Sequence, residues 1–231
     1  MADIVLYGSP ISPFQRKCEV LLREKGLEFD SENVNVLGMP DWFAEISPAR
    51  RIPVLRDRRI GAEGVAGTIA DSSAICTFLE RLAPTPSFYP EDPYAAGRAV
   101  WFEEYADSEL AGLAGGGIFR PIMFPRFQGR DSDVDTARAT FRDQLPEKFD
   151  YLERSLGSRD WLVGDAPTIG DVAVACMLAQ IGLVAELPLA ERWPALAAHY
   201  TRMTERPSMA ANLAICAKML AKLVPEKLDL S

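Results

Sequence analysis

Residues 9–17, SPISPFQRK, lie where a predicted strand gives way to a predicted helix. The preceding residues 4–7 are a short apolar run, which is typical of a buried strand. In residues 13–25 apolar side chains recur at helical spacing, and the glycine that follows is a common helix end. Ser12, with a proline after it and Gln15 three positions on, therefore predicts the start of that helix as a capping box.

The rest of the N-terminal third continues the alternation of strands and helices. A short helical or irregular segment is expected around Trp42 and Phe43, and a helix with regularly spaced apolar residues follows Asp71. The resulting order is β-α-β-α-β-β-α, which indicates an α/β domain with a mixed sheet. The further expected strands are residues 29–36, 52–55 and 67–70.

A change of composition marks a boundary after this domain. Residues 83–93, APTPSFYPEDP, are dense in proline, which breaks regular structure and indicates a linker. Everything after it is expected to be helical. The sequence therefore predicts an α/β domain over residues 1–83, a linker over residues 84–93 and an all-helical domain over residues 94–231.

Three features of the helical part are specific. Apolar residues at helical spacing over residues 137–156 predict one helix, which Pro146 should kink. Thr168 and Asp171 form a capping motif before an apolar helix over residues 172–185. Residues 110–135, which are rich in glycine and aromatic side chains, lie between two helices and receive no assignment.

Composition excludes several classes of function. The net charge of −8 argues against a nucleic-acid binder and against a binder of anionic membranes, since both need a basic face. No run of eighteen apolar residues is present, so no transmembrane helix is expected. The start of the chain has no basic region followed by an apolar core, so we expect no signal peptide. These features predict a cytoplasmic protein.

The cysteines and the single histidine narrow the chemistry. The four cysteines are far apart without a CxxC pair, so no metal site is expected and buried free thiols in a reducing cytosol are the prediction. His199 is the only histidine, which removes most Ser-His, Cys-His and two-histidine metal arrangements. Any catalysis must therefore work without an ordinary histidine base.

Four stretches, in this order along the chain, carry a resemblance to a known family. They are residues 12–16, SPFQR; residues 51–55, RIPVL; residues 71–75, DSSAI; and residues 168–171, TIGD. Each is common alone, but the four together, with the two domains and the linker, resemble the cytosolic glutathione S-transferases over essentially the whole chain. The first stretch is similar to the Ser-Pro-Phe segment of tau-class enzymes and the Cys-Pro-Phe segment of omega-class enzymes, and it matches the spacing of the phi-class serine. The chain thus resembles a bacterial, serine-type member.

The resemblance implies a thioredoxin-like N-terminal domain that binds glutathione as cosubstrate, without a metal. Ser12 would be the catalytic residue, hydrogen-bonded to the glutathione sulfur. Ile52, before a cis proline, would present its N–H and C=O to the cysteinyl part. Asp71 would hold the γ-glutamyl ammonium, and Ser72, at a helix N-terminus, the γ-glutamyl carboxylate. The implied glutathione-binding residues are Phe14, Arg51, Ile52, Pro53, Asp71 and Ser72.

One departure from the family concerns the glycyl carboxylate of glutathione. Phi and tau enzymes place a lysine near the start of the segment that precedes Asp41, whereas residues 37–40 here, LGMP, hold no base. Arg51, or else Arg50, would have to take that role. The alternative is that these two arginines are an exposed basic pair.

The chemistry implied for Ser12 needs no general base. Glutathione's thiol has a pKa of about 8.5, like free cysteine, and the thiolate is the nucleophile. A hydroxyl that donates to the sulfur, together with the positive end of a helix, stabilises the anion. Ser12 can serve as cap and activator together, since capping uses the oxygen as acceptor and activation uses its proton. Ser9 and Tyr7 are alternatives, although Tyr7 is the more natural strand core residue.

The resemblance leaves the second substrate and the exact reaction open. An apolar electrophile is expected, and detoxification by conjugation is the leading reading, with isomerisation, dehalogenation or a non-enzymatic scaffold as alternatives. Disulfide reduction is disfavoured, because it needs a cysteine at position 12, where this chain has a serine. A homodimer is expected as in the family. The candidate pocket residues are Ile11, Trp101, Tyr105, Phe119, Phe124 and Phe127.

Overall fold

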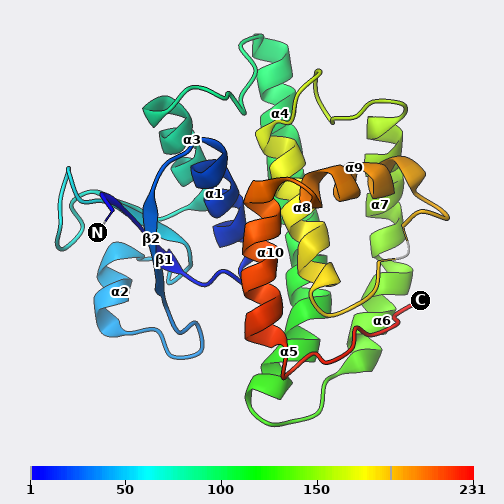
Figure 1. The fold of residues 1–231 in the computed structure, drawn as a ribbon. Helices are drawn as coiled ribbons and strands as arrows, with labels where there is room; N and C mark the ends of the chain where they lie inside the picture. The colour runs from blue at the N-terminus through cyan, green and yellow to red at the C-terminus, as the bar shows by residue number, and fades with distance from the viewer. Residues whose placement is uncertain (1, 188) are drawn as a thin grey trace. The chain divides into compact units, whose positions relative to one another are not determined.

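The structure, a computed structural model, describes residues 2–187 and 189–231 (Figure 1). The chain divides into two compact units between Ser87 and Phe88. This division falls inside the predicted linker, in which no strand or helix occurs before α4 begins at Pro93. The domain bounds expected from the sequence stay a prediction.

The N-terminal unit has the predicted β-α-β-α-β-β-α order, which confirms its fold class. Its sheet has the strand order β2-β1-β3-β4. Strand β1 pairs in parallel with β2 and antiparallel with β3, and β3 pairs antiparallel with β4. The bounds are β1 Ile4–Gly8, α1 Pro13–Glu24, β2 Phe29–Asn33, α2 Asp41–Ile46, β3 Val54–Asp57, β4 Thr68–Ile69 and α3 Ser72–Leu82.

The two faces of this sheet are covered by different helices. Val5 and Tyr7 of the central strand β1 pack in one buried cluster with Phe43 and Ile46 of α2. Leu6 points to the opposite face, because side chains alternate along a strand. Helices α1 and α3 pack against each other there (Figure 1). Both faces are thus apolar, which explains why all five residues of β1 are buried.

Every predicted strand differs at an end from the structure. Strand β1 also includes Gly8, β3 continues to Asp57, and β4 covers only Thr68–Ile69 of the expected 67–70. Strand β2 stops at Asn33 and not at residue 36, because Asn35 accepts a hydrogen bond from the N–H of Leu37 and turns the chain. Strand β3 begins at Val54 and not at residue 52, since Pro53 has no N–H to donate to the ladder. The segment before Val54 is therefore left outside the sheet.

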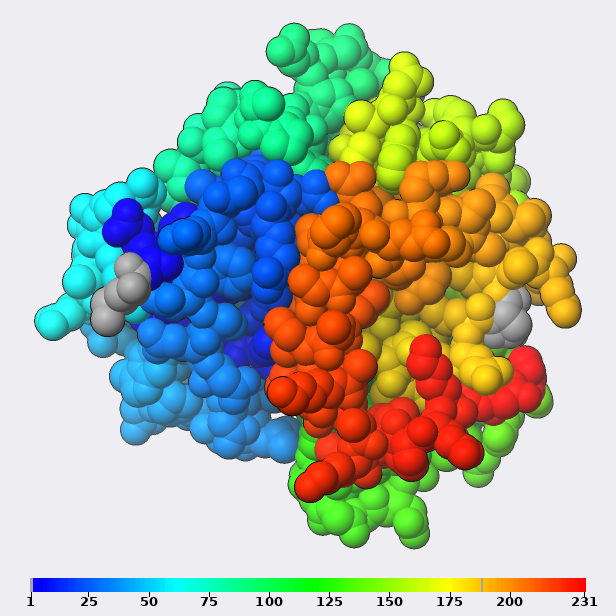
Figure 2. Space-filling model, viewed as in Figure 1, coloured from blue at the N-terminus to red at the C-terminus, as the bar shows by residue number. Residues whose placement is uncertain are grey.

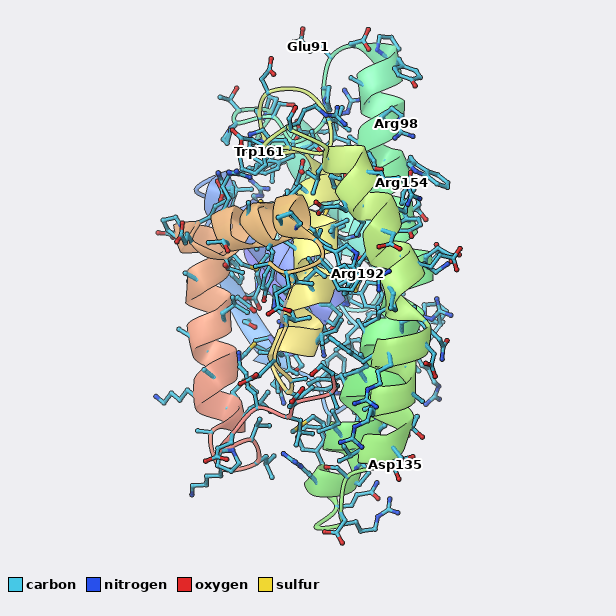
Figure 3. The ribbon with its side chains drawn as sticks, turned by 90° about the vertical axis from the view of Figure 1, so that its right-hand side faces the viewer. Glu91, Arg98, Asp135, Arg154, Trp161 and Arg192 are labelled. Atoms are coloured by element: carbon cyan, nitrogen blue, oxygen red, sulfur yellow. The ribbon has the colours of Figure 1, made fainter. Side chains whose placement is uncertain are left out.

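The C-terminal unit is all helical, as predicted. Its central helix α8 is buried along its length, and α4, α9 and two wide π-type turns pack around it. The bounds are α4 Pro93–Tyr105, η1 Ala106–Leu110, η2 Gly112–Phe119, α5 Arg120–Phe127, α6 Val134–Asp143, α7 Leu145–Leu156, α8 Ile169–Gly182, α9 Pro194–Thr204 and α10 Pro207–Leu220. Figure 3 shows Arg98 on α4 and Arg154 on α7 along one side of this unit.

Two parts of this unit correct the expectations. The single kinked helix over residues 137–156 is two helices, α6 and α7, and Pro146 lies in the first turn of α7, where its missing N–H costs nothing. The unassigned glycine-rich segment forms η1, η2 and α5. A Cβ at Gly117 of η2 would lie 2.5 Å from Thr140 Cγ2 of α6, so this close helix packing requires glycine.

Further details concern burial and the end of the chain. All four cysteines are buried free thiols, as predicted. The C-terminal segment runs beside the residues that follow α8 (Figure 2), where the N–H of Leu228 donates to Val184 O and the N–H of Glu186 donates to Leu228 O. Among the described residues, no helix has the length and apolar character needed to cross a membrane.

Candidate glutathione site

The topology of the N-terminal unit brings the predicted site residues to the same ends of neighbouring strands, and these strand ends form one edge of the sheet. Ser12 follows the carboxyl end of β1, and Ile52 precedes the start of β3, which pairs antiparallel with β1 through Tyr7 and Val54. Asp71 follows the end of β4, whose Ile69 pairs with Leu55 near the start of β3. Because neighbouring antiparallel strands start where their partners end, these three segments share an edge.

Ser12 is the N-cap of α1. Its Oγ lies 3.5 Å from the N–H of Gln15, a long hydrogen bond, and its backbone N–H donates to Ser9 O at 2.9 Å. Within the described part of the chain, the hydroxyl proton of Ser12 has no acceptor. The side chain is partly exposed. The cap therefore leaves a donor at the positive end of a helix, where an anion is stabilised.

The predicted capping box at this helix start is only half formed. Its reciprocal bond, from the Ser12 N–H to the side chain of Gln15, is absent because that N–H already bonds Ser9 O. The Gln15 amide instead donates from Nε2 to Glu19 Oε1 at 2.8 Å and to Ser31 Oγ at 3.4 Å. The capping-box prediction is thus wrong for Gln15 and right for Ser12 as N-cap.

The segment before β3 presents unused backbone groups. The Ile52–Pro53 peptide bond is cis. Neither the N–H nor the C=O of Ile52 has a hydrogen-bond partner among residues 2–187 and 189–231. Ser47 holds the backbone of Arg51, the residue before Ile52. Its Oγ donates to Arg51 O at 2.7 Å and accepts from the Arg51 N–H at 3.0 Å. Ile52 thus carries a free donor and a free acceptor on an anchored loop.

The two arginines of this loop are exposed. Arg50 has a φ of 50°, in the left-handed region, and its N–H donates to Ser47 O at 2.8 Å. Arg51 follows with its backbone held by Ser47 and its side chain in solvent. Both readings of this pair, a carboxylate-binding cation and a solvated basic surface, are compatible with this exposure.

The start of α3 offers an acidic and an anion-binding group side by side. Asp71 is the N-cap, and its Oδ1 accepts from the N–H groups of Ser73 at 2.9 Å and Ala74 at 3.0 Å. Its Oδ2 has no partner among the described residues. Ser72 is 5% exposed, and its N–H, at the first helical position, is likewise unbonded within the described chain.

Two buried cations lie in the first turns of α1. Arg16 is fully buried and its Nη2 lies 3.4 Å from Ile11 O, directly before Ser12. Lys17 is 1% exposed and its Nζ donates to Ser73 Oγ at 3.2 Å, which links α1 to the first turn of α3. Both side chains thus contact the segments that begin the two helices.

The remaining predicted residues occupy two units. Phe14 and Ile11 are partly buried beside Ser12 in the N-terminal unit. In the helical unit, Trp101 is 47% exposed and its Nε1 donates to Tyr151 Oη of α7 at 2.7 Å, while the Tyr105 ring lies 4.8 Å from that of Tyr151.

The other aromatic candidates form a separate group. The Phe124 and Phe127 rings contact each other in α5, and Phe119 is 5% exposed in the packing of η2.

Burial, with the nearby Glu109 carboxylate, raises the pKa of Tyr105 to about 12, so its phenol stays protonated at neutral pH. Tyr105 is thus a possible hydrogen-bond donor and not a phenolate.

His199 pairs with an acidic residue inside the helical unit. Nε2 of His199 lies 2.8 Å from Asp171 Oδ1, and both side chains are fully buried in the helical unit. Among the described residues, no group of three or more His, Cys, Asp or Glu side chains is placed to hold a metal ion. The Asp171–His199 pair belongs to the packing of α8 against α9.

Sequence reasoning missed how three residues contribute to this edge, although it had named Gln15 as part of a capping box. Gly8, Gln15 and Ser47 hold the backbone on which Ser12 and Ile52 lie. Gly8 closes the first strand and Ser47 precedes a proline, but both are ordinary turn signals. Nothing local in the sequence indicates that Gly8 lies next to Ile52, which is about forty residues further along the chain. Only the folded structure shows this approach.

Comparisons with known proteins agree with this fold. Family models for the glutathione S-transferase N-terminal domain and C-terminal domain match residues 6–87 and 135–202. FtsZ-localized protein A of Caulobacter vibrioides is 27% identical over 84% of this chain and 95% of that protein. The solved structure of FzlA from C. crescentus has a TM-score of 0.81 at 25% identity and covers 92% of each chain.

A further solved structure contains a glutathione derivative. The glutathione S-transferase of Methylobacterium radiotolerans JCM 2831, in complex with glutathione sulfonate, has a TM-score of 0.70 at 27% identity and covers 91% of this chain and 94% of that one. Matches to both family domains, in the right order and on the fold observed, decide the family. The chain belongs to the glutathione S-transferase family.

Proposed function

We propose that this protein binds glutathione at the edge formed by Ser12, Ile52 and Asp71, and joins glutathione through its sulfur to an apolar electrophile. The observation that carries the proposal is the Ser12 hydroxyl. Its oxygen caps α1, and its proton has no acceptor among the described residues and can be donated to a ligand. The unused N–H and C=O of Ile52 suit the cysteinyl part of glutathione. The free Oδ2 of Asp71 and the N–H of Ser72 suit its γ-glutamyl ammonium and carboxylate.

The energies are sufficient for thiol activation. Lowering the pKa of the thiol by two units requires about 2.7 kcal/mol of preferential interaction with the thiolate. One hydrogen bond to a charged group contributes about 1.5–3 kcal/mol, and a helix N-terminus about 0.3–1 kcal/mol. Ser12 and α1 supply both, and the buried Arg16 adds a cation one turn further along.

The reaction then needs no protein base. The thiol proton leaves to solvent as the thiolate forms, and the sulfur lone pair attacks the electrophilic carbon to form a C–S bond. In a substitution the bond to the leaving group breaks and that group departs with the electron pair, whereas in an addition the π electrons of the activated double bond move away from the attacked carbon and a solvent proton is taken up. Conjugation is the reaction that this arrangement supports best, with isomerisation and dehalogenation through the same thiolate as variants. The aromatic residues Trp101, Tyr105, Phe119 and Phe124 are proposed for the electrophile pocket. A cytoplasmic homodimer with a role in detoxification completes the proposal.

The test compares two serines of the same loop. Ser12→Ala should lower kcat/KM for glutathione conjugation about 10- to 100-fold, because the hydrogen bond to the thiolate is lost. Ser9→Ala, three residues earlier, should stay within about twofold of wild type. A screen of electrophiles with both variants checks this, and undiminished turnover by Ser12→Ala would reject the role of Ser12.

A second candidate function is non-enzymatic. It is favoured by the similarity to FtsZ-localized protein A, a protein named for where it localises and not for a reaction. In that case the fold would serve as a scaffold at a protein assembly. Calorimetry with glutathione separates the candidates, since a scaffold that has lost the site would show no binding. Light scattering on the purified chain tests the homodimer.

A further inference from the structure

Gln15 is a polar side chain with no exposed surface, three residues after the cap. Its Nε2 is satisfied by Glu19 and Ser31. Its Oε1 is buried and has no hydrogen-bond partner among the described residues. A buried carbonyl oxygen without a partner costs free energy, so its position calls for a reason.

The position of this oxygen is explained by Gly8. A Cβ on residue 8 would collide with Gln15 Oε1 and would also lie 3.1 Å from Ile52 Cβ. The amide of Gln15 therefore packs directly on the backbone of Gly8, at the point where Ile52 also approaches. The end of β1, the first turn of α1 and the loop before β3 thus meet at one glycine.

Each of these three segments carries or supports a group of the site. Gly8 leads into the loop that ends at Ser12, Gln15 lies in the first turn that Ser12 caps, and Ile52 holds the unused N–H and C=O. The long bond of 3.5 Å from the Gln15 N–H does not by itself fix the hydroxyl of Ser12. Packing must supply the rest of the orientation.

We infer that Gln15 is a positioning residue which, through its contact with Gly8, sets the Ser12 hydroxyl relative to the backbone of Ile52. The inference rests on the proposed function, since it concerns how well that hydroxyl meets a thiolate held by Ile52. The amide is suited to this role because its nitrogen and its oxygen make different contacts. Nε2 anchors the side chain to Glu19 and Ser31, and Oε1 rests on the only residue type without a Cβ.

The decisive measurement is the pKa of the bound glutathione thiol, followed by the ultraviolet absorbance of the thiolate against pH. Gln15→Met keeps the length of the side chain and removes both amide ends. Its thiol pKa should lie about one unit above that of wild type, which leaves about threefold less thiolate at pH 7 if the wild-type value is about 6.5, and about tenfold less at a pH well below both values. Glutathione affinity at a pH where the thiol is protonated in both proteins should change little. A purely structural role would lower thermal stability without moving the pKa.

A double-mutant cycle tests the contact itself. Gly8→Ala in the wild-type background should lose activity strongly, because its Cβ meets Gln15 Oε1 and because the φ of 155° at Gly8 disfavours any side chain. The same change in a Gln15→Ala background should cost less, since the collision with Oε1 is gone and only the φ strain and the approach to Ile52 Cβ remain. Equal costs in both backgrounds would overturn the contact. Gly97→Ala in α4, whose Cβ would meet nothing within 4 Å, is the matched control and should behave as wild type.

The outcomes separate this inference from the proposed function. If wild type and Ser12→Ala show the same thiol pKa, the proposed role of Ser12 fails and the inference fails with it. If wild type lowers the pKa and Gln15→Met lowers it equally, only the inference is overturned. Should Gly8→Ala fail to fold, the pKa of Gln15→Met decides alone.

Discussion

Two helices of this chain begin with the same local pattern, a hydroxyl residue at the cap and a polar side chain three positions later. At the start of α8, Asp171 Oδ2 accepts from both the N–H and the Oγ1 of Thr168 at 2.8 Å. Its Oδ1 accepts from the Leu162 N–H and lies 2.8 Å from His199 Nε2. At the start of α1, the corresponding box is open.

The difference lies in where the bonds go. Asp171 is fully buried and four protein groups use its oxygens, so that helix start has nothing left for a ligand. Ser12 is partly exposed, holds one long bond and keeps a donor. A cap closed by its own protein contributes stability, whereas a cap left open can contribute binding. The same sequence signal is therefore compatible with either purpose, and the proposed function assigns binding to the start of α1.

Breaking the closed cap should have the largest effect. Asp171→Ala leaves the Thr168 N–H, the Leu162 N–H and His199 buried without their acceptor, and should lower the free energy of unfolding by about 3–5 kcal/mol. Denaturant titration measures this. Asp92→Ala, at the exposed cap of α4, is the matched control and should cost about 1 kcal/mol. Equal costs would show that the buried network adds nothing to the cap.

Replacing the open cap should change the chemistry and not the fold. Ser12→Cys places a thiol at the positive end of α1, which should lower its pKa below the usual value of about 8.5. The variant should gain thiol–disulfide exchange with glutathione disulfide, a reaction for which wild type has no exposed cysteine among the described residues. Ser9→Cys should react more slowly. A normal thiol pKa in Ser12→Cys would contradict the electropositive character of this helix start.

The smallest effect is expected at an exposed cap whose carboxylate titrates. Asp133 begins α6, and hydrogen bonds from the Thr136 hydroxyl and then from its N–H hold the pKa of Asp133 below the ordinary value of 3.8. A depressed folded pKa stabilises the fold above the unfolded pKa, and this contribution is lost as the pH falls through the folded pKa.

The measurement compares wild type with Asp133→Asn across acidic pH. Their difference in unfolding free energy should be constant near neutral pH and should shrink below about pH 4. A difference that does not change with pH would show that the charge of Asp133 does not stabilise this helix.

Much of the fold could be predicted because its signals are local. Helix α1 follows from the cap, the proline and the apolar spacing, and α8 follows from Thr168 and Asp171. The errors arise where tertiary contacts override local pattern. Residues 137–156 read as one apolar stripe, yet they form two helices, because the stripe records which side is buried and not where the backbone bends.

The site divides in the same way. The proposed site residues Ser12, Ile52 and Asp71 could be named from their motifs, since each motif is a turn or a helix start. Arg16 and Lys17 could not, because a charged residue in a helix pattern gives no sign of being buried. The roles of Gly8 and Ser47 depend on partners brought near by the sheet and the loop.

By itself, the sequence determined the order of the strands and helices, the caps that begin α1, α3 and α8, and the motifs of the glutathione S-transferase family. These depend on spacing along the chain and on the backbone preferences of single residues. Only the tertiary structure decided which hydrogen-bonding groups are bonded to other groups of the protein and which are available to a ligand. That is a question of burial and of partners distant in sequence. It distinguishes the closed start of α8 from the open start of α1, although both begin with the same pattern.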